Sequence, residues 1–270
     1  MRDEGLKKYF LPPASYLLTQ ENLWLASYAL GLDVASLMAR ESFSEDEIKK
    51  INSLIKRREN HEPLQYIMGV ADFYSRDFEV GSGVLIPRHD TETLIEAVKK
   101  NFLPEENFTF LDWGTGSGCI AVTILLEYKN SFAFMLEKSP DAIKYAKKNL
   151  QKFNLNDRAK IISDIDIKNL DLIISNPPYI PSDEIKNLMP EVKDYEPVLA
   201  LDGGTDGMNF YKLIFSQAEN ILKINGYIIL ETGNLEQVNK LKNLNENFIF
   251  ESEFLDYGNF PRCLVFKRRK

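Results

Sequence analysis

The sequence predicts an α/β protein in which helices cover both faces of a mostly parallel sheet, preceded by a small all-helical region. From about residue 90, short runs of β-branched and aromatic residues alternate with segments of helical spacing. Between residues 13 and 60 the apolar residues follow helical spacing, and strand signals are weak. A chain of 270 residues, 44% of them hydrophobic, is long enough for one large and one small domain.

The first sixty residues predict three helices. One ends near Gly31, and a shorter one follows it. The third begins at Ser44, because Ser44 and Glu47 have the spacing of a capping box. The apolar residues that define the helices are Leu17, Leu18, Leu23, Leu25, Ala26 and Tyr28; Val34, Leu37 and Met38; and Ile48, Ile51, Leu54 and Ile55. Together they predict a small helical bundle.

A hairpin is predicted next, because two runs rich in aromatic and β-branched residues flank Ser75-Arg76-Asp77. Glycines and a proline then interrupt the chain before a helix that begins at Thr91. The predicted parts are a helical domain over residues 1–69, a hairpin linker over 70–90 and an α/β domain over 91–270. Within the last part, strands are predicted at 108–112, 132–136, 160–162, 170–174 and 227–231, helices at 120–125, 141–153 and 211–222, and a closing strand pair near 248–250 and 263–266.

Composition excludes several classes of protein. Proteins that bind a phosphate backbone gain most of their affinity from a basic surface, whereas this chain has a net charge of −7. We therefore expect no direct nucleic-acid partner. No window reaches the roughly 18 apolar residues of a membrane span, and Met1–Phe10 lacks the apolar run of a signal peptide. We therefore expect a cytoplasmic monomer that does not bind membranes. With two cysteines and two histidines, widely spaced, we expect neither disulfides nor a metal site.

A glycine-rich turn lies between the first strand of the α/β region and the helix after it. Its G-x-G-x-G spacing differs from that of dinucleotide folds, and no Lys-Ser/Thr follows it as in a P-loop. Glycines at the carboxyl edge of a sheet let a ligand approach the backbone closely. A ligand without phosphates, with an amino-acid end and an adenosine end, suits this turn, and S-adenosylmethionine has both. The predicted cofactor-binding residues of the turn are Gly114, Thr115, Gly116, Ser117 and Gly118.

An acidic residue, Glu137, ends the next predicted strand about twenty residues later, where a carboxylate can accept hydrogen bonds from both ribose hydroxyls. Asp164 ends the following strand and is expected near the adenine edge, with Ile165 as an apolar contact. The alternative is that the turn needs glycine for its geometry alone and that Glu137 is a solvated residue at a helix start. The order of strand, turn, helix, strand and acid favours the ligand site.

The segment Asn176-Pro177-Pro178-Tyr179 follows a buried type of strand. Its prolines fix the backbone and remove donors, so the Asn176 side-chain carbonyl and the Pro177 backbone carbonyl are rigid acceptors. If they accept two N–H bonds from a planar nitrogen, its lone pair can be aimed at a methyl donor and the developing positive charge is stabilised. Tyr179 would stack on the flat group.

We therefore predict that Asn176, Pro177 and Tyr179 are catalytic, that residues 176–179 bind the substrate, and that Asn176 also adjoins the cofactor. The motif alone leaves a glutamine side chain, an adenine and a cytosine open as the acceptor. A simple turn at the end of a strand is the structural alternative.

Segments outside this core resemble the peptide chain release factor glutamine N5-methyltransferases, over nearly the whole chain. The matching segments are Glu62 to Gly69, Val84 to Glu92, Asn176 to Pro181, Glu196-Pro197, Ala200 to Gly207, Glu231 to Gly233 and Asp256 to Arg262. The resemblance implies a class I S-adenosylmethionine-dependent methyltransferase domain of Rossmann-like fold. Family members usually have Asp where this chain has Glu137, and Pro-Glu where it has His89-Asp90.

The resemblance also implies the substrate, the glutamine of the Gly-Gly-Gln motif of class I peptide chain release factors, and hence a role in translation termination. It implies that Gly114 to Gly118 bind the cofactor, that Glu137 holds the ribose and that Asn176 to Tyr179 hold the glutamine amide, with S-adenosyl-L-homocysteine as the product. The helical domain would be a docking surface for the release factor.

Three other functions stay open from the sequence. One is glutamine methylation on a ribosomal protein, and another is N6-adenine methylation of nucleic acid, which the acidic charge disfavours. The third is a non-catalytic adapter, which would have no use for two carbonyl groups fixed beside the methyl donor.

Overall fold

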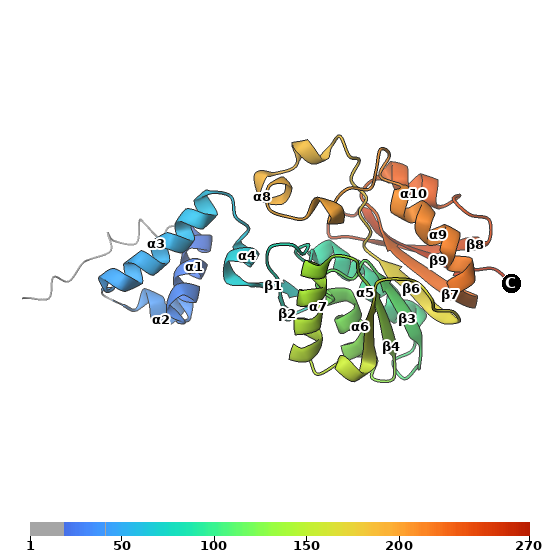
Figure 1. The fold of residues 1–270 in the computed structure, drawn as a ribbon, viewed down its shortest axis with the longest axis horizontal. Helices are drawn as coiled ribbons and strands as arrows, with labels where there is room; N and C mark the ends of the chain where they lie inside the picture. Colours follow the sequence, from blue (N-terminus) through green and yellow to red (C-terminus); the bar gives the residue numbers. More distant parts are fainter. Residues whose placement is uncertain (1–18, 41) are drawn as a thin grey trace, which may run out of the picture. The chain divides into compact units, whose positions relative to one another are not determined.

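The computed structural model describes residues 19–40 and 42–270, and the chain divides into two compact units after Gly69 (Figure 1). Leu17 and Leu18, which we assigned to the first helix, lie outside the described residues. The predicted fold class is confirmed: a helical unit is followed by a hairpin and by an α/β unit whose sheet is mostly parallel.

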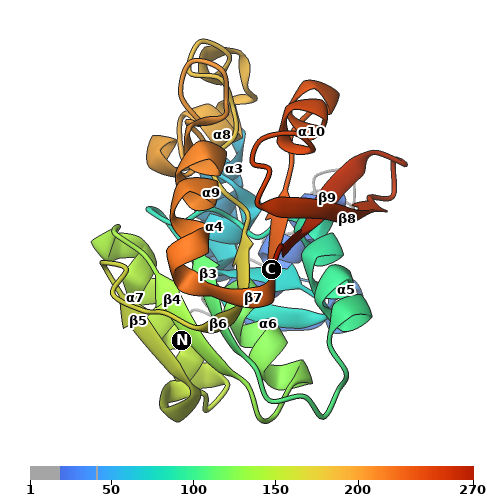
Figure 2. The same ribbon diagram turned by 90° about the vertical axis from the view of Figure 1, so that its right-hand side faces the viewer.

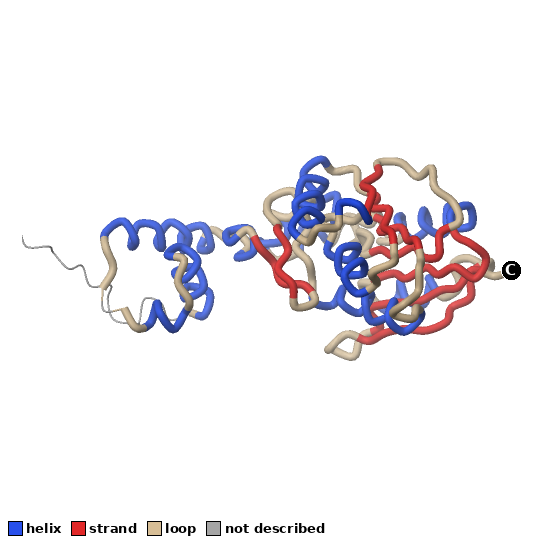
Figure 3. The backbone as a smooth tube through the Cα atoms, turned by 90° about the horizontal axis from the view of Figure 1, so that it is seen from below, coloured by secondary structure: helices blue, strands red, loops and turns tan. Residues whose placement is uncertain are grey.

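The described part of the first unit consists of helices and loops (Figure 3). The helices are α1 (Gln20–Leu30), α2 (Val34–Met38), α3 (Glu45–Glu59) and α4 (Leu64–Met68). As predicted, α1 ends at Gly31, and α3 begins with a capping box between Ser44 and Glu47. Buried apolar side chains from all four helices form its core, among them Leu25, Leu37, Ile51, Ile55 and Ile67.

Two side chains that we placed on apolar helix faces are exposed instead. Tyr28 is 48% exposed and Met38 is 59% exposed. The buried residues of α1 are Leu25 and Ala26, so Tyr28 lies at the margin of its buried face. Met38 is the last residue of a five-residue helix that buries only Leu37.

The second unit begins with the hairpin formed by β1 (Val70–Phe73) and β2 (Arg76–Glu79). Its two-residue turn has positive φ at both positions, 52° at Tyr74 and 55° at Ser75, as the primed hairpin turns require. Asn149, which is fully buried, receives the Glu79 N–H at 2.8 Å and donates to the carbonyls of Glu79 and Ser117 at 3.0 and 2.9 Å. The hairpin is therefore tied to the glycine turn by one side chain.

The main sheet has seven strands in the order β5-β4-β3-β6-β7-β9-β8. The strands are β3 (Thr109–Trp113), β4 (Phe132–Leu136), β5 (Ala159–Ile162), β6 (Leu170–Ser175), β7 (Leu222–Glu231), β8 (Phe248–Leu255) and β9 (Pro261–Arg268). The first five are mutually parallel, and β9 pairs antiparallel with both β7 and β8. The predicted strands are confirmed, although β7 begins five residues earlier than predicted.

Helices cover both faces of this sheet (Figures 1 and 2). Side chains from α5 (Glu92–Asn101), α6 (Cys119–Glu127) and α7 (Pro140–Lys152) pack on one face, against Phe110 of β3. Side chains from α9 (Asn209–Ile221) and α10 (Leu235–Leu241) pack on the other, against Leu111. Neighbouring strand residues point to opposite faces, which explains the two separate cores. Within residues 19–40 and 42–270, every helix is too short or too polar to span a bilayer.

The strand order reverses between β3 and β6, because β4 and β5 extend the sheet on one side and β6 and β7 on the other. Loops that leave the carboxyl ends of β3 and β6 therefore diverge. A crevice at such a reversal is where open α/β sheets bind ligands. The glycine turn follows β3, and Asn176 follows β6, so both predicted motifs lie at this edge.

Candidate active site

A cavity of about 530 Å³ lies at the carboxyl edge of the sheet, within the second unit, and its volume is that of a small-molecule site. Its lining consists of residues 83–88, Thr91, 113–117, Cys119, Ile120, 136–139, Ala142, 163–165, Asn176, Pro178, Pro197, Leu199, Ala200, Phe210, Leu213 and Gln217. The cavity thus joins the loops after β3, β4, β5 and β6. Most of the predicted cofactor-binding residues line it, and so do Asn176 and Pro178 of the predicted substrate-binding segment 176–179, here called the acceptor loop.

The glycine turn is held by backbone hydrogen bonds. The N–H groups of Gly114 and Thr115 both donate to the carbonyl of Leu136, at 2.9 and 3.0 Å, and Gly118 donates to Thr115 at 2.8 Å. All three glycines have positive φ, 74°, 55° and 82°. A Cβ at Gly114 would meet no atom within 4 Å, whereas one at Gly118 would lie 2.9 Å from Met135 Cε. Gly114 thus leaves open space in the cavity. Gly118 does not line the cavity, and its lack of a side chain allows Met135 to pack closely against the turn.

Glu137 follows β4 and lies beside this turn. Its Oε2 accepts from the Gly116 N–H at 3.0 Å, and its Oε1 accepts from the N–H groups of Lys138 and Ser139 at 2.8 and 2.9 Å. The Glu137 side chain, which is longer than the Asp usual in the family, thus reaches from the end of β4 to the turn after β3. Asp164 and Ile165 line the same cavity, and Asp164 accepts from Ser163 Oγ at 3.1 Å.

Asp112 lies directly under the turn and is fully buried. Its Oδ2 accepts from Thr115 Oγ1 and from the Ala121 N–H, and its Oδ1 is buried with no hydrogen-bond partner. Burial raises the pKa of Asp112 to about 7, although the hydrogen bonds from Thr115 and Ala121 lower it. A buried carboxyl group with a raised pKa therefore lies behind the glycine turn, on the side of the cavity that is predicted to bind the methyl donor.

The Asn176 side chain lines the cavity, and its Nδ2 donates to Thr91 Oγ1 at 3.0 Å. The N–H₂ end of the amide thus faces Thr91, which leaves the Oδ1 end for other donors. Thr91 is 2% exposed and ends the short 3-10 helix η2 (His89–Thr91). Sequence reasoning treated Thr91 only as a helix start and missed this contact.

Only part of the rest of the acceptor loop reaches the cavity. Pro178 lines it, but Pro177 and Tyr179 do not. The Tyr179 hydroxyl donates to Glu231 Oε1 at 3.2 Å, and its carbonyl accepts from Gln237 Nε2 at 2.7 Å. Burial, followed by the charge of Glu231, raises the pKa of Tyr179 above its usual range, so the phenol stays protonated. Stacking of Tyr179 on a substrate stays a prediction.

Glycines surround the backbone of Tyr179. A Cβ at Gly203 would lie 2.8 Å from Tyr179 Cα, and one at Gly207 would lie 2.3 Å from the Tyr179 carbonyl oxygen. A Cβ at Gly233 would lie 2.5 Å from its ring. The Ala200 to Gly207 and Glu231 to Gly233 segments, which we matched to the family without a physical reason, therefore enclose the acceptor loop.

Glu231 ends β7 and is 1% exposed. Its Oε1 accepts from Tyr179, whereas its Oε2 has no partner at hydrogen-bonding distance and angle. Burial raises the pKa of Glu231 to about 7, although the charge of Arg262 and the hydrogen bond from Tyr179 lower it. A second buried carboxyl group with a raised pKa thus lies behind Tyr179 of the acceptor loop.

Two arginines form three ion pairs near the acceptor loop. Arg88, which lines the cavity, pairs with the buried Glu196, whose Oε2 also accepts from the Ile86 N–H at 3.4 Å. Burial raises the pKa of Glu196, and Arg88 lowers it. Arg262 contacts Asp256 at 3.0 Å and Asp90 at 3.2 Å.

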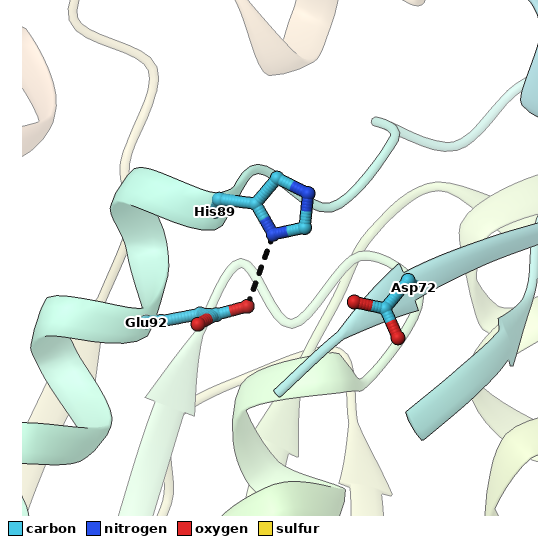
Figure 4. A group of neighbouring side chains, drawn as sticks. All are labelled: Asp72, His89 and Glu92. Carbon is cyan, nitrogen blue, oxygen red and sulfur yellow. Dashed lines mark hydrogen bonds and ion pairs between the residues drawn. The ribbon is translucent and has the colours of Figure 1, made fainter. Parts of the chain in front are cut away.

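Asp72, His89 and Glu92 form a separate group in which the possible metal-ligand atoms lie within 4.8 Å of one another (Figure 4). Glu92 Oε1 lies 3.1 Å from His89 Nδ1 and accepts from the Tyr74 N–H at 2.9 Å. The His89 side chain is 66% exposed. We assign no metal ion to this group, because Asp72 and His89 are exposed to water and Glu92 Oε1 already contacts both His89 Nδ1 and the Tyr74 N–H.

Comparisons with known proteins agree with this geometry. The model of the methyltransferase small domain matches residues 88–191, and the model of the PrmC N-terminal domain matches residues 20–69. The release factor glutamine methyltransferase of Geobacter sulfurreducens is 39% identical over 218 residues, which cover 79% of this chain and 76% of that protein. The chain belongs to the release factor glutamine methyltransferase family.

A second member of this family, from Clostridium acetobutylicum, is 38% identical and covers 89% of this chain and 88% of its own. Among solved structures, a methyltransferase from Pyrococcus furiosus has a TM-score of 0.55 at 18% identity, over 81% of this chain and 99% of that one. At that identity the likeness shows the fold alone, which is the methyltransferase fold predicted from the sequence.

Proposed function

We propose that the protein transfers a methyl group from S-adenosylmethionine to the side-chain amide nitrogen, N5, of the glutamine in the Gly-Gly-Gln motif of class I release factors. The observation that carries the proposal is the orientation of Asn176. Its amide N–H₂ is engaged by Thr91, so that its carbonyl is left for a substrate N–H in the cavity that also contains the glycine turn. The names of the family members at 38–39% identity support the choice of substrate.

The donor side of the cavity fits S-adenosylmethionine. The turn offers no Lys for a phosphate, and Gly114 leaves space where a side chain would otherwise fill the cavity. We assign Gly114, Thr115, Gly116, Ser117 and Gly118 to cofactor binding, through contact or packing. Glu137 is assigned to the ribose hydroxyls, because three N–H groups occupy three of the roughly four acceptor sites of its carboxylate and Oε2 keeps one for the ligand. Asp164 and Ile165 are assigned to the adenine.

The acceptor side would act by positioning. When bound, S-adenosylmethionine would supply the methyl group of its sulfonium centre and would leave as S-adenosyl-L-homocysteine. Asn176 Oδ1 and the Pro177 carbonyl would accept the two amide N–H bonds, which turns the nitrogen lone pair towards the methyl group. The same acceptors would stabilise the positive charge that the nitrogen gains as the C–S bond breaks and the N–CH₃ bond forms, before the nitrogen releases one N–H proton to solvent. Pro178 keeps the loop rigid, and Tyr179 anchors its far end.

Mass spectrometry of a class I release factor incubated with the enzyme and S-adenosylmethionine tests the proposal. We expect a gain of one methyl group on the Gly-Gly-Gln peptide, and none when that glutamine is replaced by alanine. An unmodified peptide after incubation with folded wild-type enzyme would refute the proposed substrate. Methyl incorporation into a nucleic acid, resistant to protease and sensitive to nuclease, would instead favour adenine methylation.

We also propose that the helical unit docks the release factor. Trp24 and Tyr28, one turn apart on α1, are 43% and 48% exposed, and they line a shallow groove with Gly31 and Met68. Exposed aromatic side chains on a groove are typical of protein interfaces. Trp24→Ala is expected to raise the KM for a whole release factor roughly tenfold, and to leave the KM for a short Gly-Gly-Gln peptide unchanged. Equal effects on both substrates would contradict docking.

A further inference from the structure

We propose that Gln237 is a positioning residue of the acceptor loop, whose buried side-chain amide holds the backbone of Tyr179 and thereby sets the place of the Pro177 carbonyl. The inference deepens the proposed function and rests on it for the identity of the substrate. Gln237 belongs to α10, is 2% exposed and does not line the cavity. It therefore acts on the substrate only through the loop.

The Gln237 amide contacts three segments of the chain. Its Nε2 donates to the Tyr179 carbonyl at 2.7 Å and to the Gly207 carbonyl at 3.4 Å. Its Oε1 accepts from the Gly233 N–H at 2.9 Å. One side chain thus joins the acceptor loop to the segment 200–207 before α9 and to the turn that follows β7.

These contacts allow only one orientation of the amide. Turning it over would place Oε1 against two carbonyl oxygens and Nε2 against an N–H group, so none of the three hydrogen bonds would remain. The backbone from which the side chain extends is also fixed, because Asn234 caps α10 by accepting from the Gln237 N–H at 2.9 Å. The position requires a side chain that has two donors and an acceptor at its end.

Two glycines leave the space that the Gln237 amide occupies. A Cβ at Gly207 would lie 2.6 Å from Gln237 Nε2, and a Cβ at Gly233 would lie 3.1 Å from its Oε1. The same two Cβ atoms would meet the backbone and the ring of Tyr179. The lack of side chains at both glycines therefore lets the amide reach the loop backbone.

The acceptor loop is held at both ends, and Gln237 holds the far one. At the near end, Asn176 Nδ2 donates to Thr91 Oγ1 at 3.0 Å, and at the far end the Tyr179 carbonyl accepts from Gln237. The rings of the two prolines between these ends fix their φ angles. The direction of the Pro177 carbonyl therefore depends on where Tyr179 is held. A misplacement of about 1 Å in an active site can lower a rate on the order of 10²-fold.

Nuclear magnetic resonance of the Tyr179 carbonyl carbon tests this anchor without any assay of turnover. When the full chain contains carbonyl-labelled tyrosine and nitrogen-labelled isoleucine, only Tyr-Ile pairs give a correlated signal. The pairs in the sequence are Tyr66-Ile67, Tyr179-Ile180 and Tyr227-Ile228. The Tyr179 signal is identified by its loss in Tyr179→Phe.

Two variants of Gln237 are compared in this experiment. Gln237→Met keeps the length of the side chain and removes all three hydrogen bonds, whereas Gln237→Asn keeps an amide that is one methylene too short to reach Tyr179. Both are expected to shift the Tyr179 signal and to leave the other two Tyr-Ile signals in place. A Tyr179 signal that keeps its wild-type position in either folded variant would overturn the proposal.

Kinetics on the release factor separate positioning from a general loss of structure. Gln237→Met is expected to lower kcat roughly tenfold to a hundredfold, with a smaller change in the KM for the release factor and a Kd of S-adenosylmethionine within about twofold of wild type. Asn101→Ala is the matched control, because it removes a partly buried amide that donates to the Ala97 carbonyl at 2.8 Å. It is expected to leave kcat and the Tyr179 signal unchanged.

Two kinetic outcomes would contradict the role of Gln237. One is a wild-type kcat in Gln237→Met, and the other is a fall in kcat with an equal loss of cofactor affinity, which would indicate general disruption of the cavity. If the wild-type enzyme fails to methylate release factors, the proposed function fails, and the resonance experiment still decides whether Gln237 holds Tyr179.

Discussion

The donor and acceptor sides of the cavity lie on neighbouring strands but are held in place by different kinds of contact. On the donor side, backbone N–H groups of the glycine turn make most of the contacts, to the Leu136 carbonyl and the Glu137 carboxylate, and the buried side chains of Asp112 and Asn149 support the turn at Thr115 and Ser117. On the acceptor side, side chains hold side chains: Asn176 binds Thr91, and Tyr179 binds Glu231.

This difference predicts which property of the enzyme depends on each side of the cavity. A turn held mostly by backbone N–H groups depends more on glycine at fixed positions than on the side chains of its other residues. A loop held by a buried polar network depends on each member, because a partly satisfied network leaves buried groups unpaired. We therefore expect substitutions on the donor side to change cofactor affinity, and substitutions on the acceptor side to change turnover.

Replacing Asn176 by alanine is expected to have the largest effect. Loss of its carbonyl removes an acceptor for the substrate N–H, and kcat is expected to fall roughly 10²- to 10³-fold. The Kd of S-adenosylmethionine, measured by calorimetry, is expected to change less than threefold. Asn239→Ala, an exposed position on α10, is the matched control and should leave both values unchanged. Wild-type turnover in Asn176→Ala would refute its assigned role.

The two buried carboxyl groups, one on each side, predict a loss of stability as pH rises. The pKa values of Asp112 and Glu231 are raised to about 7 from 3.8 and 4.5, so the folded state keeps protons that the unfolded state releases. The stability they contribute is complete below the unfolded values and is lost as pH rises through 7, at roughly 4 kcal/mol for Asp112 and roughly 3 kcal/mol for Glu231.

Urea unfolding at pH 5 and pH 8 measures this loss. Asp112→Asn and Glu231→Gln are each expected to remove part of the difference in the free energy of unfolding between pH 5 and pH 8. The double variant is expected to remove both parts. A single variant with the wild-type pH dependence would show that its carboxyl group is ionised throughout the range.

Alanine variants of two glycines distinguish a glycine that is needed for close packing from one that leaves space for the cofactor. Gly207 and Gly114 have similar φ, 67° and 74°, so alanine adds similar backbone strain at both. At Gly207 the new Cβ would lie 2.3 Å from the Tyr179 carbonyl oxygen, whereas at Gly114 it would meet nothing within 4 Å. Gly207→Ala is expected to lower the free energy of unfolding about 2 kcal/mol more than Gly114→Ala. Gly114→Ala is instead expected to weaken cofactor binding, and equal losses of stability would contradict this assignment.

The smallest effect is expected at Glu137. Glu137→Gln keeps the length of the side chain but removes its charge, and is expected to raise the Kd of S-adenosylmethionine roughly tenfold. At saturating cofactor, kcat should stay within threefold of wild type. Glu236→Gln, at an exposed position on α10, controls for the loss of a surface charge. A large fall in kcat at saturation would place Glu137 in the acceptor network.

The donor side could be predicted from the sequence because its contacts are local. The turn is five consecutive residues, and Glu137 ends the very next strand, so strand order alone brings them together. The helix start at Ser44 and the end at Gly31 were predictable for the same reason, since each depends on residues within one turn.

The acceptor network could not be predicted in this way. Asn176 and Thr91 are 85 residues apart, and Tyr179 and Glu231 are 52 apart, so no spacing pattern relates them. One signal was present: Glu231 is a carboxylate at the end of the apolar run 227–230, where a charged side chain needs a reason to be buried. The match of Glu231 to Gly233 to the family identified the residue without its contacts.

Asn149 sets the smallest piece of the chain that can contain a working site. One buried amide binds both the hairpin at Glu79 and the glycine turn at Ser117, so the hairpin belongs to the scaffold of the cavity. A fragment that starts at Glu92 would lack that clamp and also Thr91, and would leave the Asn149 amide without its hairpin partners. A fragment that starts at Val70 keeps every contact described for the cavity, and would separate the chemistry of methyl transfer from the capture of the protein substrate.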